Sequence, residues 1–98
     1  MAHPALPAIH PGEILAEEYL EPLGLSAGTL AKRLHVPRTR IERVISGQTS
    51  ITTDTALRLA KFFRTSPEFW MNLQSGYDLK IESVTKQDEL ARIESFAA

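Results

Sequence analysis

Three arginines lie within six residues of this chain, in a pattern suited to contact with nucleic acid. Arg38, Arg40 and Arg43 are accompanied in this stretch by Thr39 and Glu42. A guanidinium group presents a planar fork of donors that fits the O6 and N7 atoms of guanine or the oxygens of a phosphate. On the outer face of one short helix, such groups can enter the major groove of DNA. A basic helix that contacts only solvent is the alternative interpretation.

The apolar residues around the arginines predict two short helices joined by a tight turn. The stretch reads SAGTLAKRLHVPRTRIERVISG, and Ser26 occupies the N-cap position of the first helix. Pro37 suits the first turn of the second helix, and Gly47 suits the left-handed residue after its end. Only His35 and Val36 separate the helices, which is the spacing of a helix-turn-helix. The residues expected to pack in its crook are Leu30, Ala31, Leu34, Val36, Ile41, Val44 and Ile45.

The polar side of the second helix is then expected to point away from the core. The side chains that it offers to DNA are Arg38, Thr39, Glu42 and Arg43, with Arg40 at the flank. Lys32 extends the basic surface on the preceding helix, and the loop Gln48-Thr49-Ser50 follows. The loop hydroxyls and the N–H groups at the start of the next helix can hold a phosphate, or they can serve only in ordinary helix capping. A complete helix-turn-helix pattern beside the arginines favours DNA binding over a solvated basic face.

The charge of the chain is nearly balanced in total but not along its length. The formal net charge is −1, with 11 basic and 12 acidic residues. Residues 32–43 contain five basic residues against Glu42 alone, whereas the charges of residues 13–21 are all acidic, at Glu13, Glu17, Glu18 and Glu21. Salt screens charges over about 10 Å, so a phosphate meets the local basic surface. A near-neutral monomer binds DNA weakly, which argues for a dimer.

Length and composition indicate one globular domain of 98 residues. The chain has no cysteine, which excludes disulfides and thiolate zinc sites and fits a reducing cytosol. Its histidines lack ligand spacing, so we expect no metal and no cofactor, and a structural role for His35 in the turn. No segment has the pattern of a signal peptide or a membrane span, so we expect a cytoplasmic protein without a membrane partner.

The remaining helix signals predict an all-α chain. Besides the helix pair, helices are expected at residues 11–23, 54–63, 66–79 and 85–96. We expect a flexible arm, a DNA-binding domain and a helical tail, at residues 1–8, 9–81 and 82–98. The expected core of these helices is Ile14, Leu15, Tyr19, Leu20, Ala56, Leu57, Leu59, Ala60, Phe63, Phe69 and Leu73, with Trp70 and Tyr77 in the core or a dimer contact. The apolar residues of the last helix must dock on this chain or on a second copy, at Leu90, Ile93 and Phe96.

Two further groups of residues have both a chemical and a structural interpretation. The carboxylates of Glu13 and Glu17 suit acid–base chemistry or metal binding, but no nucleophile or partner base accompanies them. A solvated face, or a surface for a basic partner, explains them better, and we do not expect an enzyme. The aromatic residues of 66–79 can stack on bases, but packing in a core or subunit interface is the more common role.

The sequence resembles a known family over residues 9–79. It shares with the HigA-type, VapI-like antitoxins the segments HPGEIL at 10–15, PLGLS at 22–26, LAKRLHVPRTRI at 30–41, ISG at 45–47, TALRLAKFF at 55–63 and SPEFWMNLQSGYDL at 66–79. These antitoxins belong to the lambda-repressor-like, Xre-type helix-turn-helix class. The helix-turn-helix part is common to many repressors, whereas the first and last of these segments are more specific to this family.

The resemblance implies a five-helix lambda-repressor-like domain with an additional C-terminal helix, and a homodimer that binds a palindromic operator. It implies contacts to base edges from Arg38, Thr39 and Arg43, and to phosphates from Arg40, Thr49 and Ser50. It also implies a partner, a HigB-type toxin of the RelE fold that cleaves mRNA on the ribosome. Such an antitoxin neutralises its toxin and represses the operon that encodes both. From charge alone, we expect the toxin on the acidic helix at 11–23.

Three positions depart from the family pattern. Ala27 stands where many relatives have a glutamine that contacts the DNA backbone, and His35 replaces a turn glycine. Gln48-Thr49 follows Gly47 where the family often has a basic pair. Two alternative functions stay open: a stand-alone Xre-type repressor without a toxin, and a protein-interaction module that has lost DNA binding, which the departures at Ala27 and Gln48 favour.

Overall fold

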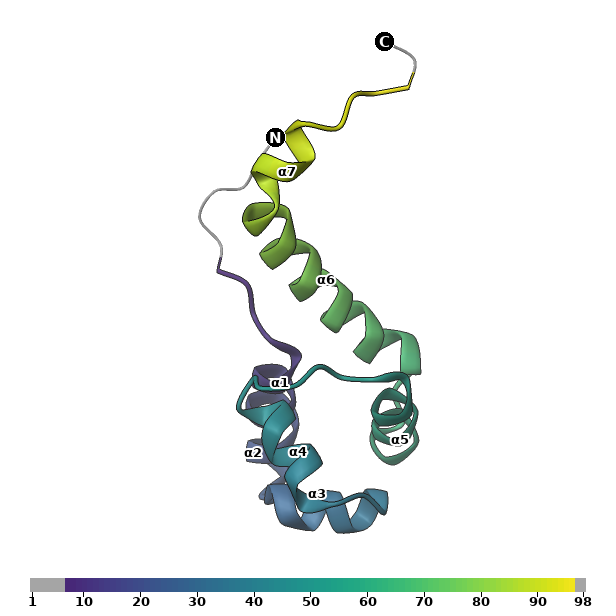
Figure 1. Ribbon diagram of the computed structural model, residues 1–98. Helices are drawn as coiled ribbons and strands as arrows, with labels where there is room; N and C mark the ends of the chain where they lie inside the picture. Colours follow the sequence, from purple (N-terminus) through teal and green to yellow (C-terminus); the bar gives the residue numbers. More distant parts are fainter. Residues whose placement is uncertain (1–6, 97–98) are drawn as a thin grey trace.

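The computed structural model describes residues 7–96, and every regular element in that range is a helix (Figure 1). The elements are α1 Pro11–Ile14, the π-helix η1 Leu15–Leu20, α2 Glu21–Leu23, α3 Ala27–Leu34, α4 Arg38–Ile45, α5 Thr53–Phe63, α6 Pro67–Thr85 and α7 Gln87–Ala91. The predicted all-α fold is therefore confirmed. Residues 1–6 of the predicted arm and residues 97–98 of the predicted tail lie outside the described residues.

The first three elements form one helical run with the predicted bounds, residues 11–23. His10 caps its N-terminus, because its Nδ1 atom accepts a hydrogen bond of 2.9 Å from the backbone N–H of Gly12. The middle of the run is π-helical, which no pattern in the sequence predicted. The wider turn brings Leu15 and Leu20, which are five residues apart, into the same core.

The helix pair α3–α4 has the predicted caps, with one difference. The hydroxyl of Ser26 accepts a hydrogen bond of 3.1 Å from the backbone N–H of Thr29. His35 follows α3 in the left-handed conformation with φ 62°, and Gly47 follows α4 with φ 79°. Pro37, predicted as the first residue of the second helix, is instead its N-cap, with an extended ψ of 144°. A proline has no N–H, so its missing donor leaves nothing unpaired at this helix start.

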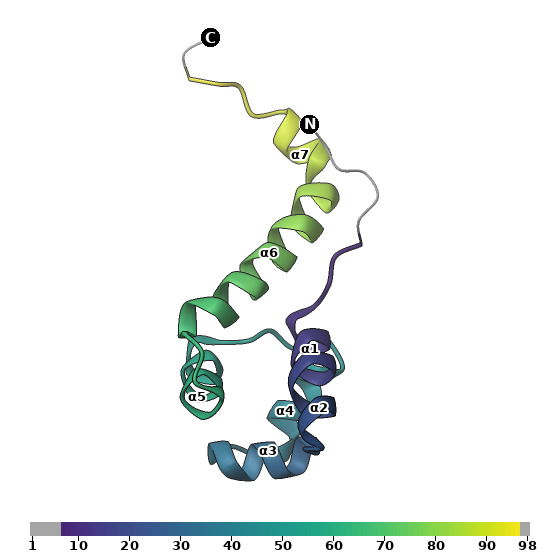
Figure 2. The ribbon, with the colours of Figure 1, turned by 180° about the vertical axis from the view of Figure 1, so that it is seen from behind.

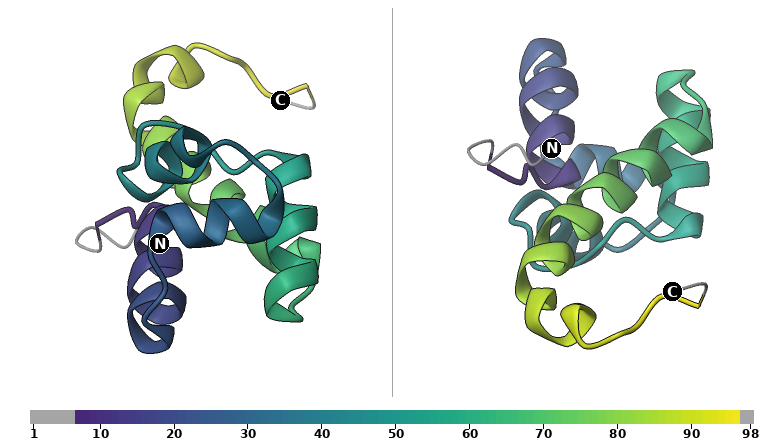
Figure 3. Two further views of the ribbon diagram at one scale, coloured as in Figure 1. Left: turned by 90° about the horizontal axis from the view of Figure 1, so that it is seen from below. Right: turned by 90° about the horizontal axis from the view of Figure 1, so that it is seen from above.

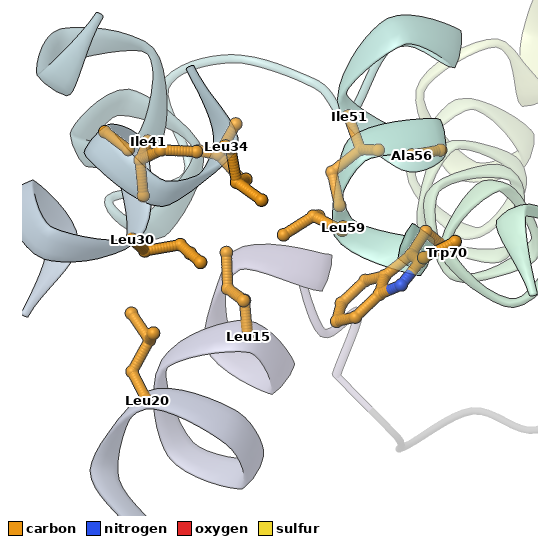
Figure 4. Packing of buried hydrophobic residues seen from close by; sticks show 12 residues of the cluster. Leu15, Leu20, Leu30, Leu34, Ile41, Ile51, Ala56, Leu59 and Trp70 are labelled. Atoms are coloured by element: carbon orange, nitrogen blue, oxygen red, sulfur yellow. The ribbon is translucent and has the colours of Figure 1, made fainter. Parts of the chain in front are cut away.

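One hydrophobic core joins the helix pair to the other helices (Figure 4). Trp70 of α6 is fully buried, and its indole N–H donates a hydrogen bond of 2.8 Å to the hydroxyl of Thr65. Its burial decides between the two predicted roles, core or dimer contact, in favour of the core. The other buried apolar residues are Leu15, Leu20, Leu30, Ala31, Leu34, Ile41, Val44, Ile51, Ala56, Leu59 and Ala60.

Two side chains that were predicted in the core lie at the surface instead. Leu57 is 52% exposed, because it follows the buried Ala56 by one residue and so points about 100° away around α5. Phe69 lies at the edge of the core, where its ring packs against Trp70 with a centroid distance of 4.9 Å. Tyr77 is half-buried and packs edge-on against His10 at 4.9 Å. The aromatic residues of α6 therefore pack mainly within this chain.

The helix α6 is longer, and the last helix shorter, than predicted. α6 continues to Thr85, so the predicted domain end at residue 81 lies inside it. α7 covers only Gln87–Ala91 instead of 85–96, and the apolar side chains of the predicted helix lie outside the core of residues 7–96, with Leu90 51% and Ile93 71% exposed. The outer part of α6 and α7 extend away from the other helices (Figures 1 and 2), and the molecule measures 53 × 25 × 22 Å. Seen from above, α6 crosses the other helices diagonally (Figure 3).

Gly12 allows α1 to pack directly on the end of α4. A Cβ atom at this position would lie 1.9 Å from the carbonyl oxygen of Val44, which is far inside van der Waals contact. The cap residue His10 lies close to the residue that follows α4, with its ring 3.8 Å from where a Cβ atom of Gly47 would be. The first helical run therefore supports α4 from the inside of the domain.

We expect Gly12→Ala to lower the free energy of unfolding by about 1–3 kcal/mol, because the added methyl group forces α1 and α4 apart. Urea denaturation measures this change. Gly76→Ala is the matched control, because Gly76 lies within α6 and an added methyl group would meet no neighbouring element within 4 Å. That variant should gain about 0.5–1 kcal/mol from helix propensity. Equal stability of the two variants would contradict the close packing of α1 on α4.

Candidate DNA-binding surface

The helix α4 turns its apolar side into the core and its polar side to solvent. Ile41 and Val44 are 0% and 1% exposed, and each packs in the cluster that also holds Leu30 and Leu34 of α3. The orientation predicted for this helix is therefore observed. The side chains on its outer face are Arg38, Thr39, Glu42 and Arg43, all exposed, with Arg40 half-buried at the flank.

Two of the three arginines on α4 form ion pairs with carboxylates of the same surface. The Nε atom of Arg38 donates to Glu42 at 2.7 Å, one helical turn away. The side chain of Arg38 also lies over the start of α3, 3.5 Å from a Cβ position at Gly28. Arg40 donates to Asp54 of α5 at 2.5 Å. Arg43 takes part in none of the ion pairs among residues 7–96.

Asp54 also accepts a hydrogen bond from Arg58, one turn further along α5. The Nε atom of Arg58 donates to the same carboxylate oxygen at 2.9 Å, and a terminal nitrogen donates to the backbone carbonyl of Leu34 at 2.8 Å. The hydrogen bond from Arg40, and then that from Arg58, hold the pKa of Asp54 below its ordinary value. The carboxylate is therefore ionised at neutral pH, and this network links α4, α5 and the end of α3.

A shallow groove beside α4 contains several of the predicted site residues. Its lining includes Thr39, Arg40, Arg43, Thr49 and Ser50, and it continues to the start of α5. The backbone N–H groups of residues 48 and 49 both donate to the carbonyl of Arg43 and are not available to a ligand, whereas the side chains of Thr49 and Ser50 are exposed. At the helix start, the hydroxyl of Thr52 accepts from the N–H of Thr55, which is the capping alternative.

The loop that carries Thr49 and Ser50 is anchored on α6. The buried side chain of Gln74 accepts a hydrogen bond of 2.7 Å from the backbone N–H of Ile51, the residue that ends the loop. Its amide nitrogen donates to Asp78 at 3.0 Å, which fixes the orientation of the amide. The hydrogen bond to α6 therefore fixes the position of this loop relative to α4.

Lys32 and Gln48 lie outside this groove. Lys32 is exposed in the last turn of α3, and Gln48 is exposed directly after the left-handed Gly47. Both extend the polar surface rather than the groove itself. The positions that depart from the family pattern keep the local geometry: Ala27 is the first residue of α3, and His35 takes the left-handed turn conformation.

Asp54 and Arg58 are parts of this surface that were not predicted from the sequence. Their spacing of four residues within a helix was a visible signal for an ion pair. The contact between Arg40 and Asp54 spans fourteen positions and depends on how α5 packs beside α4, so no local pattern indicates it.

The model of the helix-turn-helix family matches residues 17–70, which is more than half of the chain and includes α3 and α4. The chain belongs to the helix-turn-helix family. Its relatives identify the branch as the HigA-type, VapI-like antitoxins of the Xre class, as the sequence motifs had suggested. Virulence-associated protein I of Dichelobacter nodosus is 55% identical over 82 residues, which are 84% of this chain and 76% of that protein.

Solved structures of this branch have the same fold. An addiction module antidote protein of the HigA family from Coxiella burnetii is 47% identical, with a TM-score of 0.87, over 93% of this chain and 100% of that one. Antitoxin HigA of Pseudomonas aeruginosa, solved with the higBA promoter, is 38% identical, with a TM-score of 0.88, over 91% and 98% of the two chains. The chain is thus a HigA-like antitoxin with a helix-turn-helix DNA-binding domain.

Two other kinds of site find no support among the described residues. No group of three or more histidine, aspartate or glutamate side chains within residues 7–96 is arranged to hold a metal ion. Of the helices in the same range, none has the length and apolar character to cross a bilayer.

Proposed function

We propose that two copies of this chain bind the operator of their own operon and that the chain also binds and neutralises a RelE-fold toxin encoded beside it. The outward arginine face of α4, fixed by the burial of Ile41 and Val44, is the observation that carries the DNA-binding part. The promoter complex of Pseudomonas aeruginosa HigA supports this part, since that protein has the same fold. Its operator would then lie upstream of the gene for this chain.

The contacts that we propose follow the exposed groups of the surface. Arg38, Thr39 and Arg43 project from α4 towards base edges in the major groove, where Glu42 can accept from a cytosine amino group. The groove with Arg40, Thr49 and Ser50 suits a phosphate, because it offers a cation and two hydroxyls. Lys32 and Gln48 lie outside the groove, are exposed, and are proposed as additional phosphate contacts. In a dimer, two such helices enter major grooves about 34 Å apart.

We expect Arg43→Ala to weaken operator binding by about 1–3 kcal/mol and to relax the preference at one base pair, if the guanidinium contacts a guanine. Fluorescence anisotropy on a series of operator variants measures both effects. Lys32→Ala should weaken binding equally on all sequences and reduce the dependence of affinity on salt. Arg64→Ala, an exposed arginine at the end of α5 and outside the proposed contacts, serves as the matched control. An equal loss on every sequence with Arg43→Ala would make Arg43 a phosphate contact.

The dimer is proposed from the apolar residues that this chain leaves uncovered. Leu79 on the outer part of α6 is 70% exposed. Together with Leu90 of α7 it lines a second shallow groove, separate from the one beside α4. Val84 and Ile93, at 68% and 71%, extend the exposed apolar surface. The apolar residues of the last helix, Leu90, Ile93 and Phe96, were expected to dock on this chain or on a second copy, and within residues 7–96 all three stay exposed. A second copy that packs on α6 and α7 removes this apolar surface from water.

We expect Leu79→Asp to convert a dimer into a monomer and to reduce operator affinity at least about tenfold, because a charge in an apolar interface lacks a partner. Sedimentation equilibrium gives the mass, and the same anisotropy assay gives the affinity. Leu23→Asp is the control, because Leu23 is also an exposed leucine, 59% accessible at the end of α2. A Leu79→Asp protein that remains dimeric would place the subunit contact elsewhere.

The toxin contact is proposed for the acidic face of the first helical run. All four of its carboxylates are exposed, at Glu13, Glu17, Glu18 and Glu21. A basic partner can approach this face without competing with DNA for the arginines of α4.

Co-expression with the neighbouring gene should rescue growth and yield a co-purified complex. The double substitution Glu17→Lys and Glu18→Lys should abolish both effects while operator binding is unchanged, since it reverses the charge of the proposed contact only. Glu68→Lys, an exposed carboxylate of α6, is the control. Operator binding without any toxin in the neighbouring frame would indicate a stand-alone repressor, and the loss of all promoter binding would indicate an interaction module.

A further inference from the structure

Each of two arginines on the proposed DNA-binding face already has an anionic partner before DNA arrives. Arg38 donates to Glu42 on its own helix, and Arg40 donates to Asp54 on the neighbouring helix. The two carboxylates differ in how firmly they are held. Glu42 is fixed only through its own side-chain pair, whereas Asp54 belongs to a wider network.

The position of Asp54 is fixed independently of Arg40. It lies in the first turn of α5, whose start is capped by the hydroxyl of Thr52. Arg58 donates to the same carboxylate oxygen at 2.9 Å and is itself tied to the carbonyl of Leu34 at 2.8 Å. If Arg40 moves towards a phosphate, Asp54 therefore cannot follow it. The carboxylate remains on the edge of the groove that Arg40, Arg43 and Thr49 line.

We propose that Asp54 is a specificity-determining residue, which holds Arg40 in one direction and disfavours contacts with DNA in the wrong register. This inference rests on the proposed DNA-binding function. Asp54 occupies one terminal N–H group of Arg40, and the guanidinium retains other donors for a phosphate. Arg40 can therefore contact Asp54 and a phosphate at the same time only if the phosphate lies where the remaining donors of the fixed guanidinium group point.

The effect differs between operator and non-specific DNA for a physical reason. Non-specific binding consists almost entirely of phosphate contacts, which form in many registers. In most registers Arg40 must leave Asp54 to reach a phosphate, and the carboxylate then lies close to the DNA backbone with Arg58 as its remaining cationic partner. In the operator complex, base contacts fix one register, so the arginine keeps its partner. The anionic Asp54 therefore weakens non-specific binding more than operator binding.

The test is Asp54→Asn, which removes the charge and retains the shape of the side chain. The probes are a duplex from upstream of the gene and a scrambled duplex of equal length and composition, titrated at several salt concentrations. We expect affinity for the scrambled duplex to rise about three- to tenfold, with a salt slope steeper by about one phosphate contact. Operator affinity should change less, so the ratio of the two affinities falls.

Two controls separate this effect from a general change of charge or stability. Glu68→Gln removes an exposed carboxylate from the corresponding first turn of α6, outside the groove, and should leave the ratio unchanged. In an Arg40→Ala background, Asp54→Asn should have little further effect on the scrambled duplex, because the two residues act as a pair. Thermal unfolding without DNA shows that each variant is folded.

The outcomes distinguish this inference from the proposed function. If the unmodified protein does not prefer its upstream DNA over the scrambled duplex, both the proposed function and the role of Asp54 are wrong. If the unmodified protein has this preference but Asp54→Asn leaves non-specific affinity and salt slope unchanged, the role of Asp54 alone is wrong. An equal gain with and without Arg40 would also overturn it, since Asp54 would then act only through net charge.

Discussion

The burial of Ile41 and Val44 is the constraint on which the rest of the surface depends. A helix of eight residues has few ways to be held, and two fully buried side chains on one side fix its rotation about its axis. Gly12 adds a second constraint, because α1 can approach the end of α4 only without a side chain there. Once the rotation is fixed, the positions of the arginines follow from the helical repeat.

A near-neutral chain is compatible with DNA binding because its charges are sorted by helix. The first helical run carries only acidic side chains among its charged ones, whereas α3 and α4 carry five of the 11 basic residues of the chain. Within the arginine surface, Glu42 and Asp54 lower the local charge without removing the donors. Attraction that depends only on net charge dominates the binding of DNA without sequence preference. The two carboxylates weaken this attraction, so contacts with well-defined geometry contribute a larger share of the binding.

The sequence predicted those features that depend on neighbours along the chain. The caps at Ser26 and Gly47, the left-handed His35 and the outward face of α4 follow from spacing and backbone preferences, and all are observed. Features that depend on contacts between distant residues were missed or wrong. The pair of Arg40 and Asp54 needs the packing of α5, and the exposure of Leu57 depends on which side of α5 meets the core. The end of α6 was placed too early, because no proline or glycine marks it and its outer apolar residues Leu79 and Val84 are exposed and give no core pattern.

The 19 residues of α6 connect the fully buried Trp70 with the uncovered Leu79 in one uninterrupted helix. If two copies meet at its outer part, this helix is the spacer between the subunit contact and the operator. Each inserted residue would lengthen it by about 1.5 Å and rotate everything beyond by about 100°. An insertion of a single residue would therefore misalign the two arginine surfaces relative to the operator. Conversely, an operator whose two half-sites are shifted by a fraction of a DNA turn would need an α6 of different length.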